Sequence, residues 1–259
     1  MSAGAPPPMS PAESLSGRRV VITGAARGLG RAFAIKAAEH GADLVLLARS
    51  AAALDPLAEL IRRRTGRHVT CVPCDLADAQ SVAEACRQTL AATPIVDVLI
   101  NNGASWLPGR FEQLADADIT ATVATTVTGT MLITRGLLPA LRRSVAADVV
   151  TIVSTAGLPG ERSGAVSVAF RAAKQGQSGF SEALRDELRG TGIRVTAIYP
   201  PDFDDTDPLK PEWDEPRAPV VGAKLTNREV VATILFAVCA PRICGYPAIG
   251  RRRAAPAPR

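Results

Sequence analysis

The chain has 259 residues, of which 47% are hydrophobic, and this length suits one large α/β domain with a substantial buried core. Its net charge of +5 comes from scattered arginines and only 4% of its residues are aromatic, a composition that argues against nucleic-acid binding. The longest apolar run, 230–240, is too short to span a bilayer and the N-terminus lacks an apolar signal core, so no membrane association and a cytoplasmic location are predicted.

The first half of the chain predicts an alternation of strands and helices. Residues 1–16 are rich in Pro, Ala and Ser and lack apolar periodicity, so we expect a flexible N-terminal tail. From Arg19 a short apolar strand runs into a glycine-rich turn and then a helix that ends at Gly41. Further strands are expected at 42–48 and 69–74, and further helices at 51–65 and 79–92. Such alternation at short spacing indicates parallel strands joined by crossover helices.

The second half continues this pattern. The run 95–100 is apolar on both faces, as expected of a central parallel strand. The elements expected beyond it are helices at 113–124 and 128–143, a strand at 149–153, a helix that carries Lys174, a strand at 193–199 and a helix at 227–240. Residues 250–259 are rich in Arg and Pro, and we expect a second flexible tail there. One domain over 17–249 is therefore predicted, a Rossmann-like α/β fold with a seven-stranded, doubly wound parallel sheet flanked by helices.

The glycine-rich turn TGAARGLG, at 23–30, joins the first predicted strand to the first helix. Gly24, Gly28 and Gly30 lack a Cβ, which lets a pyrophosphate approach the backbone, and the N-terminus of a helix favours negative charge. Turns also use glycine for purely steric reasons, but strand, loop and helix follow here in the order that a dinucleotide site requires. We therefore predict that this loop, including Leu29, binds a cofactor.

Two arginines flank the predicted cofactor loop. Arg27 lies within it, and Arg49 follows the second strand, where an acidic residue would hold a ribose 2′-hydroxyl. Two guanidiniums near this place suit a 2′-phosphate, so the predicted cofactor is NADP, with NADPH preferred over NADH. Either arginine alone could instead be a solvated surface residue.

Three further segments make the chain similar to a known family. Asp75 and Leu76 follow the third strand, NNGA occupies 101–104 after the fourth, and RAAKQGQSGFSEALRDELRGTGIRV occupies 171–195. Together with the glycine-rich turn, in this order and spacing, they resemble the short-chain dehydrogenase/reductase (SDR) family over about residues 19–240. The family's usual order at 101–104 is Asn-Asn-Ala-Gly, and the last two residues are exchanged here.

The resemblance implies further cofactor contacts. Asp75 would bond the adenine amino group and Leu76 would line the adenine pocket, although Asp75 could also cap the next helix. The other expected contacts are Asn102 and Gly103 at the adenine ribose, Lys174 at the nicotinamide ribose, and Pro200 after the sixth strand.

The resemblance also implies a catalytic site, with two departures. The family transfers a hydride between nicotinamide and a carbonyl or alcohol, using a Tyr as general acid/base, a Lys four residues later, a Ser that orients the substrate oxygen and an Asn in a proton relay. Lys174 matches the lysine and Ser154 the serine. The tyrosine position is Phe170, and the relay position is Thr126.

Loss of a positioned acid costs about 10²–10⁴-fold in rate, which leaves hydride transfer possible but slow. A hydrogen bond from Ser154 and the field of Lys174 would remain, and a substrate could supply its own proton from a neighbouring phenol or enol. The first hypothesis is an NADP(H)-dependent oxidoreductase of small carbonyl or alcohol compounds with an atypical, tyrosine-free site. The alternative is a catalytically inactive, cofactor-binding protein that serves as a regulatory or structural subunit.

The remaining expectations concern partners and the segment after the sixth strand. The acidic residues of 202–215 surround Trp213, and this segment is either a substrate lid or a solvated mobile loop. The long helices at 128–143 and 167–189 have small-residue faces that would allow a homodimer, a homotetramer or pairing with a related subunit. Two histidines and a single CxxC motif predict no metal site.

Overall fold

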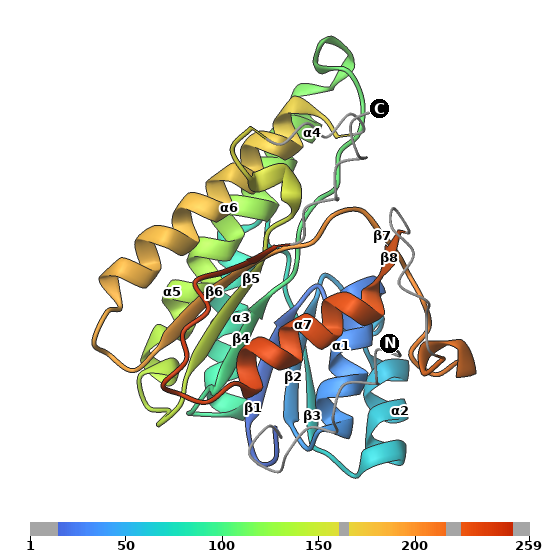
Figure 1. Ribbon diagram of the computed structural model, residues 1–259, viewed down its shortest axis with the longest axis vertical. Coiled ribbons are helices and arrows are strands. Elements are labelled where there is room, and N and C mark those ends of the chain that lie inside the picture. Colours follow the sequence, from blue (N-terminus) through green and yellow to red (C-terminus); the bar gives the residue numbers. More distant parts are fainter. Residues whose placement is uncertain (1–14, 161–165, 216–223, 251–259) are drawn as a thin grey trace, which may run out of the picture.

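The computed structural model describes residues 15–160, 166–215 and 224–250, and their centre is a parallel sheet of seven strands (Figure 1). The strand order is β3-β2-β1-β4-β5-β6-β9. The strands are added on one side of β1 up to β3 and on its other side from β4 onward, so the strand order reverses between β1 and β4. The strands are β1 (Arg19–Thr23), β2 (Asp43–Ala48), β3 (Val69–Pro73), β4 (Val98–Asn101), β5 (Asp148–Ile152), β6 (Arg194–Tyr199) and β9 (Ala248–Gly250). Two short segments, β7 (Phe203–Asp204) and β8 (Leu225–Thr226), pair separately. The predicted fold class, a doubly wound parallel sheet flanked by helices, is confirmed.

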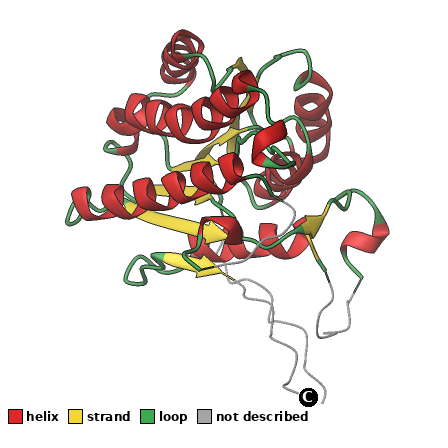
Figure 2. Ribbon diagram, turned by 90° about the horizontal axis from the view of Figure 1, so that it is seen from above, coloured by secondary structure: helices red, strands yellow, loops and turns green. Residues whose placement is uncertain are grey.

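Helices cover both faces of this sheet (Figure 2). One layer holds α1 (Gly28–Glu39), α2 (Asp55–Thr65) and α7 (Asn227–Cys239), and the other holds α3 (Ala79–Ala92), α5 (Gly129–Leu141) and α6 (Val168–Glu187). Each layer has its own hydrophobic cluster against the sheet, and the central strands contribute to both. The continuous apolar runs of β1, β4 and β5 follow from this burial on two faces.

The long helix before β5 is continuous where two helices were predicted. A short helix, α4 (Asp116–Val123), runs through a π-helical turn, η3 (Ala124–Thr128), into α5 without a break. Gly129 directly follows this turn, and a Cβ there would lie 2.3 Å from the carbonyl oxygen of Leu76, so the close approach of Leu76 requires glycine. The wider turn places Thr126, which is fully buried, on the inner side of the helix. Such π-turns are often found at functional sites.

Three predicted boundaries are corrected by the structure. Leu15 is fully buried and its amide donates to the carbonyl of His40 at 3.0 Å, so the predicted tail over 1–16 is wrong at its C-terminal end. Gly250 closes β9 and does not belong to a second tail; residues 1–14 and 251–259 lie outside the described residues. The second helix begins at Asp55, not at 51, because Pro56 suits the first turn of a helix.

Candidate active site

The predicted site residues gather at the carboxyl edge of the sheet. The glycine-rich turn follows β1, Asn102 follows β4, Ser154 lies just beyond β5 and Pro200 directly follows β6. These four strands are neighbours in the order β1-β4-β5-β6, which includes the point where the strand order reverses. Open α/β sheets bind their ligands in the crevice at such a point.

The glycine-rich turn forms a cradle with no room for side chains at its base. Gly24 and Gly28 have φ angles of 66° and 55°, which favour glycine. A Cβ on Gly30 would lie 2.3 Å from the carbonyl oxygen of Gly24 and 2.7 Å from Nδ2, the side-chain nitrogen of Asn102. The N-cap residue of α1, Arg27, makes no side-chain cap, and the first turn of α1 has no acidic residue. These features fit a dinucleotide phosphate at the N-terminus of α1.

Asn102 ties the glycine-rich turn to β4. Its side-chain amide donates to the carbonyls of Thr23 at 2.9 Å and Gly24 at 3.2 Å. The hydroxyl of Thr23 in turn accepts hydrogen bonds from the backbone amides of Asn102 and Gly103. Leu76 packs on Gly103, where an added Cβ would be 2.5 Å from its side chain. Asn102 and Gly103 therefore shape the cradle through its backbone.

Asp75 does not cap the next helix, which was the alternative that the sequence left open. The N-cap of α3 is Asp78, whose carboxylate accepts from the amide of Gln80. The carboxylate of Asp75 accepts from the amide of Ala77 at 2.9 Å and remains partly exposed. Asp75 is thus placed at the end of β3 with an oxygen left for a further donor.

Arg27 and Arg49 are both exposed at the same edge of the sheet. Arg27 precedes α1 and Arg49 directly follows β2. Neither forms an ion pair with another described residue, so both guanidiniums are available to an incoming anion.

Ser154 has a backbone conformation that L-residues rarely adopt. Its φ of 148° and ψ of 157° lie in a region that is almost exclusive to glycine. The hydroxyl accepts a hydrogen bond from the amide of Ala156 at 3.1 Å, which fixes it beside a short 3-10 turn, η4 (Thr155–Gly157). Such conformations cost about 1–3 kcal/mol and cluster at functional sites. The strain supports the predicted role of Ser154 as a substrate-orienting hydroxyl.

Lys174 is buried, although a lysine among alanines often lies in solvent. Lys174 is only 4% exposed. Its Nζ donates to the carbonyl of Ile152 at 3.0 Å and to Oε1 of Gln177 at 2.9 Å. Burial lowers the pKa of Lys174 to about 7. Lys174 is therefore attached to the end of β5, two residues before Ser154.

Phe170 lies one helical turn before Lys174. The helix α6 starts at Val168, and its cap, Ser167, accepts from the amide of Phe170 at 3.1 Å. The ring is buried, with its centroid 5.7 Å from the Nζ of Lys174. An aromatic ring at this distance stabilises a cation but cannot donate a proton.

Two residues that the sequence reasoning missed connect Lys174 to Thr126. The side-chain amide of Gln177 donates to the hydroxyl of Thr130 at 2.9 Å, and that hydroxyl donates to the carbonyl of Thr126 at 2.8 Å. The hydroxyl of Thr126 accepts from the amide of Ser105 at 3.3 Å. The sequence does carry a signal for this connection. Gln177 is a polar residue one helical turn after Lys174, and Thr126 and Thr130 are four residues apart on the facing helix, so they lie on one face of it.

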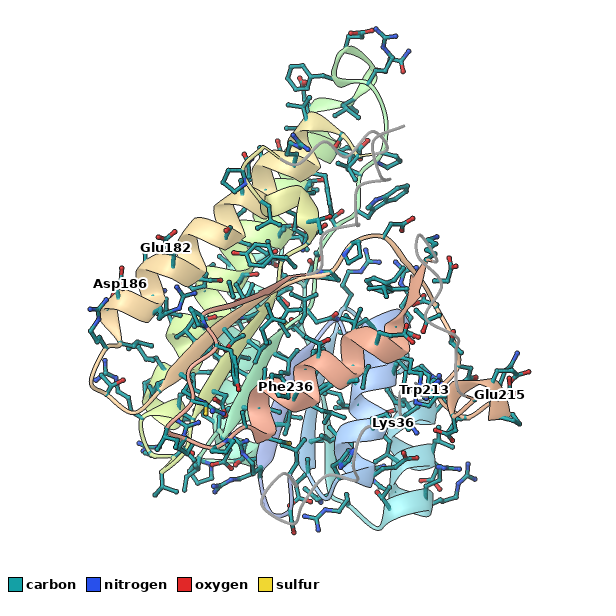
Figure 3. All side chains as sticks on the ribbon, in the orientation of Figure 1. Lys36, Glu182, Asp186, Trp213, Glu215 and Phe236 are labelled. Atoms are coloured by element: carbon teal, nitrogen blue, oxygen red, sulfur yellow. The ribbon has the colours of Figure 1, made fainter. Side chains whose placement is uncertain are left out.

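The acidic segment of 202–215 is attached to the body of the domain through a few residues, while most of its acidic side chains are exposed. Trp213 is 4% exposed and its ring lies 5.5 Å from the Nζ of Lys36, on α1 (Figure 3). Asp207 forms an ion pair with Arg31 at 3.1 Å, and Thr206 exchanges two hydrogen bonds with Asn227. These contacts attach the segment to the two helices α1 and α7.

The attachment of this segment brings the carboxylate of Asp205 close to the glycine-rich turn. A Cβ added to Gly28 would lie 3.3 Å from Oδ2 of Asp205. We expect Asp205→Asn to tighten NADPH binding about two- to fivefold, the size typical of exposed charges, because the carboxylate repels phosphate. Fluorescence titration at low and high salt would measure this, and the gain should shrink with salt. Asp214→Asn removes the same charge from the same segment; an equal gain there would contradict a local effect of Asp205.

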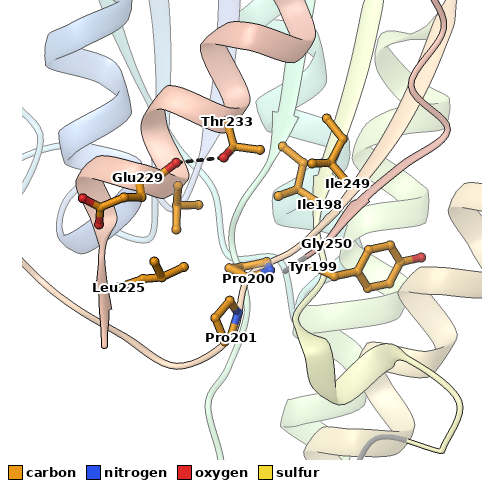
Figure 4. Close-up of a pocket in the computed structure, with 10 residues that line it drawn as sticks. Ile198, Tyr199, Pro200, Pro201, Leu225, Glu229, Thr233, Ile249 and Gly250 are labelled. Carbon is orange, nitrogen blue, oxygen red and sulfur yellow. Dashed lines mark hydrogen bonds between the residues drawn. The ribbon is translucent and has the colours of Figure 1, made fainter. Parts of the chain in front are cut away.

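A cavity of about 260 Å³ lies behind Pro200, between β6 and α7 (Figure 4). It is mostly apolar, and the ring of Tyr199 points away from it toward α6 (Figure 4). The hydroxyl of Tyr199 shares a 2.7 Å hydrogen bond with Ser178, which engages the one tyrosine near this edge of the sheet. Neither Ser154 nor Lys174 lines this cavity.

Two kinds of feature were not found in the described part of the chain. No helix there is long and apolar enough to cross a membrane. Within the same residues, no three His, Cys, Asp or Glu side chains are grouped so that they could hold a metal ion.

Comparisons with known proteins match most of the chain. A family model described as short chain dehydrogenase matches residues 18–217. The chain is 30% identical over 187 residues to the ketoacyl reductase HetN of Nostoc sp., covering 72% of this chain and 64% of that protein. It is 38% identical over 187 residues to dehydrogenase/reductase SDR family member 7B of Bos taurus, covering 70% and 56%. The chain therefore spans less than two thirds of the length of either relative.

Among solved structures, L-sorbose reductase from Gluconobacter frateurii, complexed with NADPH and L-sorbose, has the same fold. The TM-score is 0.79 at 22% identity, over 93% of this chain and 97% of that one.

Proposed function

The chain belongs to the short-chain dehydrogenase/reductase family, and from this we propose that it is an NADPH-dependent oxidoreductase of small carbonyl and alcohol compounds with a tyrosine-free site. One observation carries the proposal. The strained Ser154 and the buried Lys174 lie at the sheet edge that also holds the glycine cradle, so cofactor and substrate would meet there.

The residues present support NADP as the cofactor. The cradle of Gly24, Gly28 and Gly30 would hold the pyrophosphate, and Arg27 and Arg49 would pair with a 2′-phosphate. The L-sorbose reductase of the same fold is complexed with NADPH. Bound NADPH would supply a hydride to the carbonyl carbon.

The chain's own groups would act on the substrate oxygen. In the family motif a tyrosine stands four residues before the lysine, and here that position is Phe170. The hydroxyl of Ser154 would orient the carbonyl oxygen, and the cationic form of Lys174 would stabilise the negative charge that develops there. The relay asparagine is replaced by Thr126, whose carbonyl accepts a hydrogen bond from the hydroxyl of Thr130.

Phe170 also favours a second candidate function. A ring without a hydroxyl at the acid position is what a non-catalytic, cofactor-binding subunit would carry. The exposed faces of α5 and α6 would then join it to a second copy, as a homodimer or homotetramer, or to a related and active subunit.

The test is a binding and turnover assay on the native chain. We expect NADPH to bind about tenfold more tightly than NADH, and Arg27→Ala with Arg49→Ala to remove this difference, because each guanidinium contributes charge-assisted bonds to a 2′-phosphate. Turnover would be followed with ethyl acetoacetate, whose enol form carries an acidic hydroxyl, and with cyclohexanone, which has no comparably acidic group beside its carbonyl.

The three outcomes separate the candidates. Turnover that is lost in Ser154→Ala supports the oxidoreductase. Tight NADPH binding without turnover of either ketone supports the non-catalytic subunit. Failure to bind either dinucleotide would defeat both.

A further inference from the structure

We propose that Lys174, positioned by Gln177, is the proton donor of this site and takes the place of the missing phenol. The inference rests on the proposed carbonyl reduction and names the acid for it. It makes the substrate's own proton unnecessary, so ketones without an acidic neighbour should also be reduced.

The amine of Lys174 has one N–H group that no described residue accepts. A protonated amine has three N–H groups, and the structure assigns two of them, to Ile152 and Gln177. The third is left for a ligand at the end of β5, and in this proposal it acts on the substrate oxygen and not on the nicotinamide ribose that the family resemblance implies. Because Ile152 precedes Ser154 by two residues, the amine and the orienting hydroxyl belong to the same strand end.

The hydrogen bonds around Gln177 have only one possible set of donors and acceptors. The carbonyl of Thr126 can only accept, so the hydroxyl of Thr130 must donate to it and must accept from elsewhere. The side-chain nitrogen of Gln177 fills that role, which turns its oxygen toward Lys174. All four residues are at most 4% exposed, so solvent cannot reverse this order. Gln177 is therefore a positioning residue that always presents an acceptor to the amine.

Two opposing effects act on the proton affinity of the Lys174 amine. Burial favours the neutral amine, whereas the oxygens of Ile152 and Gln177 favour the ammonium. Burial lowers the pKa of Lys174 to about 7, which suits a general acid near neutral pH, since the amine can hold a proton and also release it.

No charged side chain in the described part of the protein contributes to this shift in the pKa of Lys174. The titratable and charged side chains on the elements next to Lys174 are Asp116 and Asp118 of α4, Arg135 of α5, Asp148 of β5, Arg194 and Tyr199 of β6, and Arg171, Glu182, Arg185, Asp186 and Glu187 of α6 itself. Among the described residues no ion pair joins Lys174 to any of them. The turns η3 and η4 carry no titratable side chain.

The proton transfer balances as follows. The carbonyl carbon gains the hydride that NADPH supplies, and the pair of electrons from the C=O double bond moves to the oxygen. That oxygen takes a proton from the ammonium of Lys174, which becomes a neutral amine. The amine recovers a proton from solvent after the alcohol leaves. Alcohol oxidation would use the same groups in reverse.

The test measures the Lys174 pKa without activity and then asks whether turnover follows it. The chain has four lysines, Lys36, Lys174, Lys210 and Lys224, so lysine-selective ¹³C NMR can resolve each side chain. We expect one signal to titrate near neutral pH and to be absent from Lys174→Met. Gln177→Glu should raise that pKa, because a carboxylate favours the ammonium, and the similarly sized Gln177→Met should lower it.

Reduction of cyclohexanone at saturating NADPH would then be measured from pH 5 to 9. We expect the rate to fall as the pH rises through about 7, because only the ammonium can donate. The midpoint should move upward in Gln177→Glu and downward in Gln177→Met, in step with the NMR titration. Lys174→Met should lower the rate at pH 6 by about 10²-fold or more.

Two results would overturn the inference while the reductase proposal stands. One is a pH profile that stays fixed while the NMR pKa moves in the Gln177 variants. The other is turnover of ethyl acetoacetate but not of cyclohexanone, which would identify the substrate as the proton source. Tight NADPH binding with no turnover of either ketone would overturn both, because no proton would then be transferred.

Discussion

Phe170→Tyr is expected to raise the rate of carbonyl reduction by about tenfold or more, which is less than the roughly 10²–10⁴-fold of a general acid added to a site without one, because Lys174 already donates a proton. The ring is already held one turn before Lys174, with its centroid 5.7 Å from the amine. A phenol there would be a second and better-placed donor, and the neighbouring ammonium would lower its pKa. The measurement is kcat at saturating NADPH for the native chain and the variant.

The added hydroxyl must also be tolerated in a buried place. Phe170 is 6% exposed, and an unpaired buried hydroxyl costs about 1–3 kcal/mol. We expect a smaller loss of unfolding free energy than this, because a donor and acceptors lie at the same strand end. Phe236→Tyr makes the same change on α7, where the side chain is half exposed, and should alter neither rate nor stability. An unchanged rate in Phe170→Tyr would show that the missing hydroxyl is not what limits this site.

Gly30→Ala is expected to weaken NADPH binding by at least about tenfold and to lower the unfolding free energy by about 1–3 kcal/mol, the usual cost of overpacking. The new Cβ would lie 2.3 Å from the carbonyl oxygen of Gly24, so the cradle must open or α1 must shift. Urea unfolding and a fluorescence titration with NADPH would measure the two effects.

Gly179→Ala is the matched control. Gly179 also lies inside a helix, α6, but a Cβ there would meet nothing within 4 Å. Alanine should therefore stabilise the helix by about 0.5–1 kcal/mol and leave NADPH binding unchanged. Equal binding by the Gly30 and Gly179 variants would mean that the cradle is not the cofactor site.

Much of the fold was accessible from local sequence patterns. Apolar runs such as those of β1 and β4 report burial on two faces of a parallel sheet, and glycines at fixed spacing report a turn without room for Cβ atoms. Topology then places the carboxyl ends of neighbouring strands together. For this reason the glycine cradle and Ser154 could be expected at one edge before any tertiary contact was known.

Local patterns were less informative about boundaries and about segments held by distant contacts. Leu15 is buried because it packs on α1, and nothing in the polar sequence around it indicates this. The segment with Trp213 has the composition of a solvated loop, yet Trp213 is part of the core and Asp207 pairs with Arg31. Attachment of this kind depends on which surface lies opposite the segment, which composition does not encode.

The sequence by itself therefore determined the parallel α/β sheet, the glycine-rich turn between β1 and α1, and the absence of a tyrosine four residues before Lys174. Only the tertiary structure decided the state of that lysine. Its burial arises from the packing of α6 on β6 and on the turns η3 and η4, and its acceptor, Gln177, is oriented by Thr130 on a different helix. Proton affinity depends on solvent exclusion and on the direction of hydrogen bonds, and both are properties of the packed molecule.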